Sequence, residues 1–227
     1  MSTEVFDLAA TPVRELNTRL HAAEDGARWQ ILHPAGVHSV AVGLDSDMEV
    51  EVDGHVGYYC AGMNKHATVR VHGNAGAGLA ENIMSGTVVV DGDASAAAAA
   101  TGHGGLVVIH GDAAARCGIS MKGVEIVVHG SVGHMAAFMA QKGCLVVCGD
   151  AGGALGDSIY EARVYVRGTV ESLGADCVEK EMRAEHVAQL THLLERAGAE
   201  GCDPSEFRRY GSARTLYNFH PDNAGSY

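Results

Sequence analysis

Histidine and cysteine are the side chains of this sequence that could supply chemistry, since the chain holds 13 histidines and six cysteines. A set of mostly polar residues recurs every 19 positions, and three consecutive members are His110, His129 and Cys148. These are typical zinc ligands, but ligands on neighbouring rungs of a flat surface do not converge on a tetrahedral centre. We therefore predict a solvated polar ladder without a metal, formed by Asp53, His72, Asp91, His110, His129, Cys148 and Arg167.

The cysteines follow no ligand or redox pattern. Cys144 and Cys148 are the closest pair, and no second pair accompanies them. The spacing is also too wide for the disulfide scaffold of a small secreted domain. Reduced thiols that serve as small apolar side chains are the simpler interpretation for Cys60, Cys117, Cys144, Cys148, Cys177 and Cys202.

Known catalytic and nucleotide-binding motifs are also missing from the sequence. It has no G-x-S-x-G nucleophile motif and no G-x-x-x-x-G-K-[ST] phosphate loop. The string NAGAG at 74–78 resembles part of a dinucleotide fingerprint, but its glycines belong to a repeat and no helix follows them. We predict that this chain contributes no catalytic, cofactor-binding or metal-binding residue.

Composition limits the partners. The formal charge is -12, the pI is about 5.4 and no run of lysine and arginine occurs, which disfavours binding to nucleic acid or anionic membranes. The first residues show no signal-peptide pattern, and no stretch approaches the roughly 20 apolar residues that span a bilayer. We therefore expect a cytoplasmic protein.

A 19-residue repeat positions these side chains. The residues two and four positions before each repeated glycine are aliphatic in all seven repeats, so each repeat predicts one short strand with both side chains inward. Nineteen residues leave no room for a crossover helix, so equivalent strands stack in parallel. We predict an all-β fold, a single-stranded right-handed parallel β-helix over 48–175. Its turn glycines are Gly54, Gly73, Gly92, Gly111, Gly130, Gly149 and Gly168.

The two ends depart from the repeat and are expected to cap the stack. Residues 1–47 form an N-terminal arm and cap, with a helix after Thr11-Pro12 and an irregular first coil. Residues 176–227 form a C-terminal amphipathic helix, stopped by Gly198, and an extended partner-binding tail. The apolar stripe of this helix is expected to contain Val178, Met182, Val187, Leu190, Leu194 and Ala197.

An apolar stripe also faces outward from the predicted solenoid, three positions before each glycine. Such a stripe is normally covered, either by the chain's own helix or arm or by another chain, and the sequence leaves both alternatives open. The candidate interface residues are Val89, Val108, Val127, Val146 and Tyr165, with Tyr217 and Phe219 from the aromatic tail.

A second turn glycine recurs in several coils. Its member Gly123 falls one position earlier than in the other coils, which predicts a bulge or a slipped turn there.

These features carry a family resemblance. The repeated glycines, the run AARCGISMKGVEIVVHGSVGHMAAFMAQKGCLVVCGDAGGALGDS and the closing helix resemble the C-terminal GXGXG β-helix domain of the glutamate synthase large subunit, over about residues 50–175. The segment VGHMAAFM at 132–139, followed by Lys142-Gly143, resembles the GDH-x-CEYM-x-GG signature of that family. Gly133 and His134 match the signature, whereas its acidic residue and its tyrosine are absent here.

With its arm and the tail GSARTLYNFH, the chain is most similar to the free-standing β-helix subunits of N-methylglutamate synthases, the methylamine–glutamate N-methyltransferases. The resemblance implies a non-catalytic scaffold between an amidotransferase-like subunit and an FMN-binding subunit that also carries an iron–sulfur cluster. Two alternatives share a β-helix: the solenoid subunit of a formylmethanofuran dehydrogenase or formyltransferase/hydrolase complex, and a stand-alone β-helix enzyme. Hexapeptide acyltransferases need coils divisible by six, which 19 is not.

Overall fold

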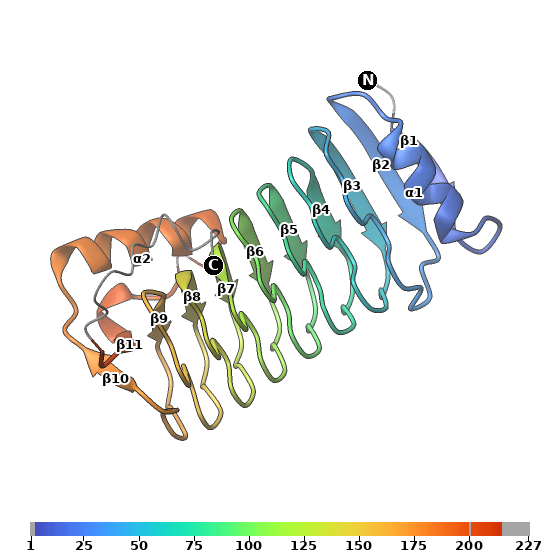
Figure 1. Cartoon of the computed structure of the whole chain (residues 1–227). Helices are drawn as coiled ribbons and strands as arrows, with labels where there is room; N and C mark the ends of the chain where they lie inside the picture. Colours follow the sequence, from blue (N-terminus) through green and yellow to red (C-terminus); the bar gives the residue numbers. More distant parts are fainter. Residues whose placement is uncertain (1–2, 200, 215–227) are drawn as a thin grey trace.

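A single sheet of eleven strands runs along the molecule in the computed structural model, which describes residues 3–199 and 201–214 (Figure 1). The first nine strands follow one another in sequence order, and all of them pair in parallel. Their bounds are β1 Glu4–Asp7, β2 Ala27–Leu32, β3 Met48–Asp53, β4 Thr68–Val71, β5 Thr87–Val90, β6 Leu106–Ile109, β7 Lys122–Val128, β8 Lys142–Val147 and β9 Arg163–Val166.

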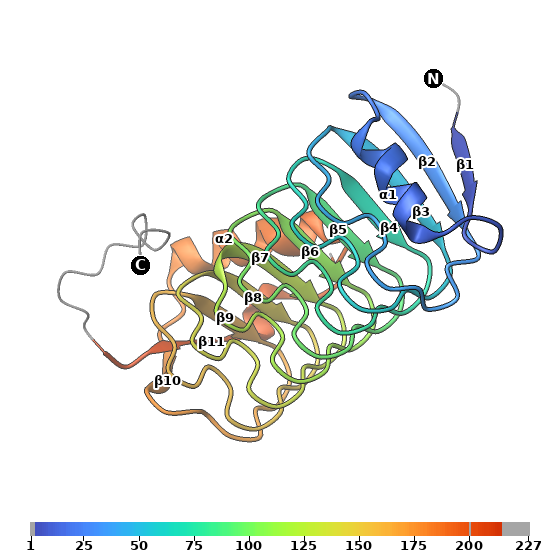
Figure 2. The ribbon, with the colours of Figure 1, turned by 45° about the vertical axis from the view of Figure 1, so that its right-hand side comes forward.

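The 19-residue repeat is the register of this sheet from β3 to β9. Val69 pairs with Val88, which pairs with Val107, and the same step continues along the stack. The inward residues two and four positions before each glycine are almost completely buried, as predicted. Because β-branched side chains suit a pleated, buried surface, one aliphatic pair per coil is enough to form each short strand. The predicted parallel β-solenoid is confirmed (Figure 2).

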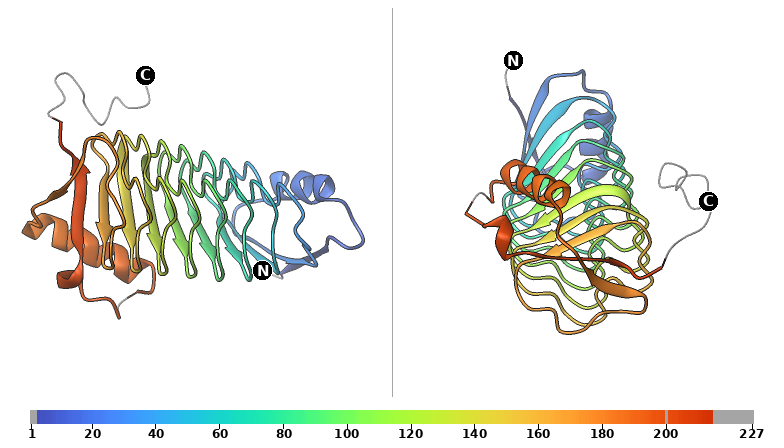
Figure 3. Two further views of the ribbon diagram at one scale, coloured as in Figure 1. Left: turned by 90° about the horizontal axis from the view of Figure 1, so that it is seen from below. Right: turned by 90° about the vertical axis from the view of Figure 1, so that its left-hand side faces the viewer.

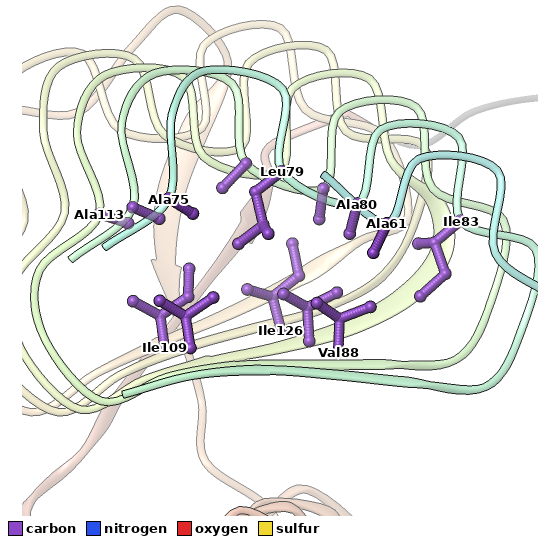
Figure 4. Close-up of a cluster of buried hydrophobic side chains, with 14 of the residues drawn as sticks. Ala61, Ala75, Leu79, Ala80, Ile83, Val88, Ile109, Ala113 and Ile126 are labelled. Atoms are coloured by element: carbon purple, nitrogen blue, oxygen red, sulfur yellow. The ribbon is translucent and has the colours of Figure 1, made fainter. Parts of the chain in front are cut away.

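A second wall lies across the core from the sheet, where Ile109 and Ile126 approach Ala75, Leu79 and Ala113 (Figure 4). It is held by isolated parallel bridges between Val56, Ala75, Ala94, Ala113, Val132, Ala151 and Val170, which lie two positions after the repeated glycines. The residues six positions after the glycines are also fully buried, namely Cys60, Leu79, Ala98, Cys117, Ala136 and Leu155. The narrow interior explains why many of these core side chains are small.

The turns that follow the second wall have an alternating backbone conformation. Within one coil, Ala97, Ala99 and Thr101 all have φ between 55° and 61°. The N–H of Ala97 donates to a carbonyl of the next coil, and that of Ala99 donates to a carbonyl of the preceding coil. Left-handed conformations cost about 1–2 kcal/mol for a residue other than glycine. Here hydrogen bonds between coils offset that cost, in a pattern that side-chain periodicity did not predict.

The irregularity predicted at Gly123 is present. Lys122 pairs with Lys142, whereas Glu125 pairs with Cys144, so the step between partners changes from 20 to 19 residues along β7. Gly123 itself has a φ of 150°, and its Cβ would clash with the carbonyl oxygen of His103 in the preceding coil. A bulge of this kind admits one extra residue without shifting the register of the following strand.

The N-terminal cap continues the sheet. The predicted helix is α1, Val13–His21, and it buries Leu16 and Leu20. Of the predicted irregular first coil, residues 27–32 form β2 and residues 38–42 form turns. The sequence did not predict β1, which adds one more parallel strand. The side chains of the cap and the solenoid belong to one continuous apolar core.

At the other end the chain reverses. β10 (Cys177–Lys180) leads to α2 (Ala184–Arg196), and a 3₁₀ turn (Pro204–Glu206) then leads to β11 (Arg208–Ser212). β11 lies antiparallel between β9 and β10, so β10 is the last strand of the sheet (Figure 3). The predicted helix is confirmed, and Gly198 has a φ of 67° just beyond it.

The bounds of α2 correct its predicted stripe. Val178 lies in β10 and Met182 precedes the helix, whereas the fully buried Leu193 was not predicted. The reason is that β10 pairs with β11, a partner too distant in the sequence for local periodicity to reveal. Among the described residues neither helix has the length and apolar character needed to cross a membrane.

Candidate functional site

The outward apolar stripe of the sheet lies beneath α2. Val108, Val127 and Val146 form a second apolar core with Leu190, Leu193 and other residues of the helix. Val127 is 0% exposed, and Val89, at the end of the helix, is only partly buried. The sequence left open whether the stripe is covered by the chain's own helix or by another chain, and the structure shows that α2 covers it.

This placement corrects the predicted interface. Val108, Val127, Val146 and Tyr165 do not face solvent, because the apolar face of α2 matches the stripe and removes both from water. A partner cannot contact these side chains while α2 is in place. Of the three remaining candidates, Val89 is only partly buried, and Tyr217 and Phe219 lie outside the described residues.

The buried end of the stripe is polar. Tyr165 Oη and Arg163 Nη1 both donate to Gln189 Oε1 of α2, at 3.0 Å and 2.8 Å. Burial raises the pKa of Tyr165 to about 12, so its hydroxyl keeps its proton at neutral pH. These two bonds fix the position of the first turns of α2 over the end of the sheet.

The predicted polar ladder changes character along the solenoid. In its N-terminal half, His72 lies between Asp91 Oδ2 (2.7 Å from Nδ1) and Glu51 Oε2 (2.5 Å from Nε2), and Arg70 Nη2 is 2.6 Å from Asp91 Oδ1. Further along, the rings of His110 and His129 have centroids 4.7 Å apart.

His129 and Cys148 of this ladder are covered rather than solvated, which corrects the prediction for these two residues, whereas Arg167 is exposed as predicted. Nε2 of His129 is 3.0 Å from the carbonyl oxygen of Ala197, and Cys148 is buried in the core under α2. The helix and the segment after it cover both residues. Within residues 3–199 and 201–214 no group of three or more histidine, cysteine or acidic side chains is placed to hold a metal ion.

The charged half of the ladder predicts a pH dependence. Burial acts to lower the pKa of His72, but hydrogen bonds to Asp91 and Glu51 raise it above the usual value of 6.5. A raised folded-state pKa stabilises the fold fully below about 6.5, and this contribution is lost as the pH rises through the raised pKa. The pKa of Asp91 is lowered by His72 and Arg70 against the effect of burial, so its contribution is lost as the pH falls through that lowered pKa.

We therefore expect this cluster to stabilise the fold most between about pH 4 and 6.5. A titration of His72 followed by NMR should give a pKa above 6.5, and Glu51→Gln should reduce the shift. A pKa for His72 at or below 6.5 would contradict the prediction.

A second polar ladder was missed by the sequence reasoning. The residue after each of the first six repeated glycines accepts a hydrogen bond from the backbone N–H of the equivalent residue in the next coil. The signal was visible as short polar residues at this position. The bonds run from the N–H of Asp93 to Asn74 (2.9 Å), of Asp112 to Asp93 (2.8 Å), of Ser131 to Asp112 (2.7 Å), of Asp150 to Ser131 (3.0 Å) and of Thr169 to Asp150 (2.6 Å).

This ladder explains the repeated glycines. Gly54 has a φ of 133°, but the others avoid the left-handed region and are required instead by close approach between coils. A Cβ on Gly73 would lie 2.7 Å from the carbonyl carbon of Gly54. The predicted turn glycines are therefore needed where successive coils pack closely. At five of the seven, a Cβ would also meet a side-chain oxygen of the polar ladder.

The cysteines are free thiols in the structure. Burial raises the pKa of Cys60, Cys117 and Cys144 to about 12 in each case. A thiol with such a pKa is almost entirely protonated at neutral pH and is a poor nucleophile. These side chains serve as small apolar residues, as the sequence predicted.

Comparison with known proteins gives one near-complete match. No family model matches the sequence. Protein GlxC from Rhizobium meliloti (strain 1021) is 62% identical over 226 residues, which cover 98% of this chain and 99% of that protein.

Proposed function

Because this chain belongs to the same family as Protein GlxC, and because its solenoid resembles the glutamate synthase β-helix domain, we propose that it is a scaffold subunit of a glutamate-synthase-type enzyme. The match extends over nearly the whole of both chains, which supports the same role for the two proteins. The resemblance of the 132–139 segment and of the repeated glycines supports the choice of enzyme class.

The observation that carries the scaffold role is the filled interior of the solenoid. The inward positions of the strands from β3 to β9 are all occupied by buried apolar side chains, and the buried Asn64 lies outside the strands, where it donates to the main-chain oxygen of Ala67. Such a core leaves no interior space for a substrate, and close packing makes the stack stiff. A stiff rod held by hydrogen bonds between successive coils suits the role of fixing the distance between two partner subunits.

The specific enzyme that we propose is N-methylglutamate synthase, which converts methylamine and glutamate into N-methylglutamate and ammonia. The partners would be an amidotransferase-like subunit and an FMN-binding subunit, which also holds the iron–sulfur cluster. This chain would support amine or ammonia transfer between them without a catalytic side chain of its own. The complex would be cytoplasmic.

Purification from the native host tests this proposal. With an affinity tag at the N-terminus, we expect native mass spectrometry to show two further subunits and the eluate to show a flavin absorbance spectrum. Peptide sequencing should identify one subunit as amidotransferase-like. The complex should form N-methylglutamate when methylamine and glutamate are supplied.

The variant Val127→Lys is purified in parallel with the unchanged chain for comparison. It removes the apolar side chain on which α2 packs and leaves the inward side of the coils unchanged. A chain that elutes alone under native conditions would contradict the scaffold role. Co-purification with the catalytic subunits of a formylmethanofuran dehydrogenase would instead assign the chain to that complex.

A further inference from the structure

A cleft of about 820 Å³ lies at the C-terminal end of the molecule. Its walls come from β7 to β11 and from the first turns of α2. The volume lies within the range of small-molecule sites, about 300–1,000 Å³. Although the chain has a net charge of -12, six of its 16 lysines and arginines line this cleft, namely Lys142, Arg163, Lys180, Arg183, Arg209 and Arg214.

The sheet register brings several of these cations together. Arg209 of β11 lies directly opposite Lys180 of β10, and on its other side it lies opposite Tyr165 of β9. Arg163 is two residues before Tyr165 and therefore shares its face of the sheet. Like charges directly opposite each other in a sheet are unfavourable. The antiparallel return of β11 thus concentrates positive charge at one place.

Two of the arginines lack an anionic partner in the part of the chain that the structure describes. Arg183 pairs with Glu181 at 3.1 Å, and Arg214 pairs with Asp176. In contrast, Arg163 donates to the neutral amide oxygen of Gln189. Arg209 Nε donates to the main-chain oxygen of Glu181, at 3.0 Å, and neither Arg163 nor Arg209 makes an ion pair there.

The environment of Arg209 shows that its charge is only partly compensated. Burial lowers its pKa and the nearby Arg163 and Arg183 lower it further, while Tyr165 and Glu185 act in the opposite direction without reversing the shift. The same arginines and burial lower the pKa of His186, which is almost completely buried in the cleft wall. His186 Nε2 is 3.4 Å from Glu185 Oε1, and an anion bound beside the guanidinium groups of Arg163 and Arg209 would relieve their mutual repulsion.

Acidic side chains lie around these cations at more exposed positions. Glu161, Glu179 and Glu185 line the cleft and are exposed, whereas Arg163 and Arg209 are half-buried. Glu125 is already paired with Arg196, at 2.5 Å. The cleft therefore has a cationic floor and an acidic rim.

We propose that this cleft binds a small zwitterion, an amino acid whose carboxylate lies on Arg163 and Arg209 and whose ammonium group meets the glutamates of the rim. Guanidinium groups present paired N–H donors that match the two oxygens of a carboxylate. A simple anion would use the floor and leave the rim unsatisfied. The proposal stands on the charges of this chain and does not depend on the proposed function.

Isothermal titration of the full chain with L-glutamate, glutarate and inorganic phosphate tests it. Glutarate retains both carboxylates and lacks the ammonium group. We expect L-glutamate to bind with a Kd on the order of 1 mM and glutarate to bind about tenfold more weakly. Glutarate or phosphate that binds as tightly as L-glutamate would overturn the zwitterion site, and so would the absence of heat with L-glutamate up to about 50 mM.

Variants locate the binding. Arg209→Gln and Arg163→Gln should each weaken L-glutamate binding about tenfold or more. Arg209→Lys keeps the positive charge but loses the paired N–H donors of the guanidinium group, so it should also weaken binding. This variant also provides a test if Arg209→Gln does not fold. Arg28→Gln is the matched control, since Arg28 pairs with Glu49 at the other end of the molecule. Equal affinities in Arg209→Lys and Arg28→Gln would overturn the assignment.

Discussion

Gly111→Ala is expected to destabilise the protein by about 3 kcal/mol, the upper part of the range for overpacked interiors. A Cβ at this position would lie 2.8 Å from the carbonyl carbon and oxygen of Gly92, and closer still to Asp93 Oδ1. Neither residue can move freely. The N–H of Gly111 donates to the oxygen of Gly92, and Asp93 Oδ1 accepts from the N–H of Asp112.

Urea unfolding followed by circular dichroism measures this effect, with Gly201→Ala as the control. A Cβ on Gly201 would have no atom within 4 Å, and its φ lies outside the left-handed region. The control should therefore change the free energy of unfolding by less than about 0.5 kcal/mol. If both variants unfolded at the same urea concentration, the close contact between coils would not be the reason for glycine at this position.

Val127→Lys is expected to release α2 from the sheet. Val127 is 0% exposed and lies between Val108 and Val146 under the helix. An ammonium group there has no carboxylate partner in the second apolar core, and leaving a buried charge uncompensated costs about 3–5 kcal/mol. Undocking the helix avoids this cost, because the inward face of β7 still packs in the solenoid.

Limited proteolysis tests whether α2 is released from the sheet in Val127→Lys. We expect rapid cleavage between residues 181 and 199 in Val127→Lys, while the coils resist the protease and keep most of the β-sheet signal in circular dichroism. Val187→Lys is the matched control, since Val187 is on the same helix and is 37% exposed. Equal protection of α2 in both variants would mean that the helix does not shield the stripe in solution.

The repeat determined how much of the fold could be predicted. Glycines spaced by 19 residues, each preceded by two aliphatic residues of one face, are a local signal, and they gave the strands from β3 to β9. The bulge near Gly123 was also local. The antiparallel return of β11 joins Arg208 to Val166, 42 residues earlier in the sequence, and no periodicity records such a pairing.

The candidate site was less predictable for a related reason. The outward valines and the apolar face of α2 were both recognised, but their match is a tertiary contact, so the sequence could not decide between the chain's own helix and another chain. Likewise, Arg163 and Arg209 come together only because β11 returns beside β9. The short polar residues after the glycines were a local signal that was overlooked, since their role appears only when successive coils are stacked.

The polar ladder also governs how a chain of this kind can change its length in evolution. Each ladder residue donates its N–H to the equivalent residue 19 positions earlier, so a single inserted residue breaks that hydrogen bond unless a bulge absorbs it, whereas a duplicated coil adds one more bond. Descendants of this gene should therefore grow or shrink by whole coils. The distance between groups bound at opposite ends of the molecule would then change only in steps of about 4.8 Å, the spacing of one coil.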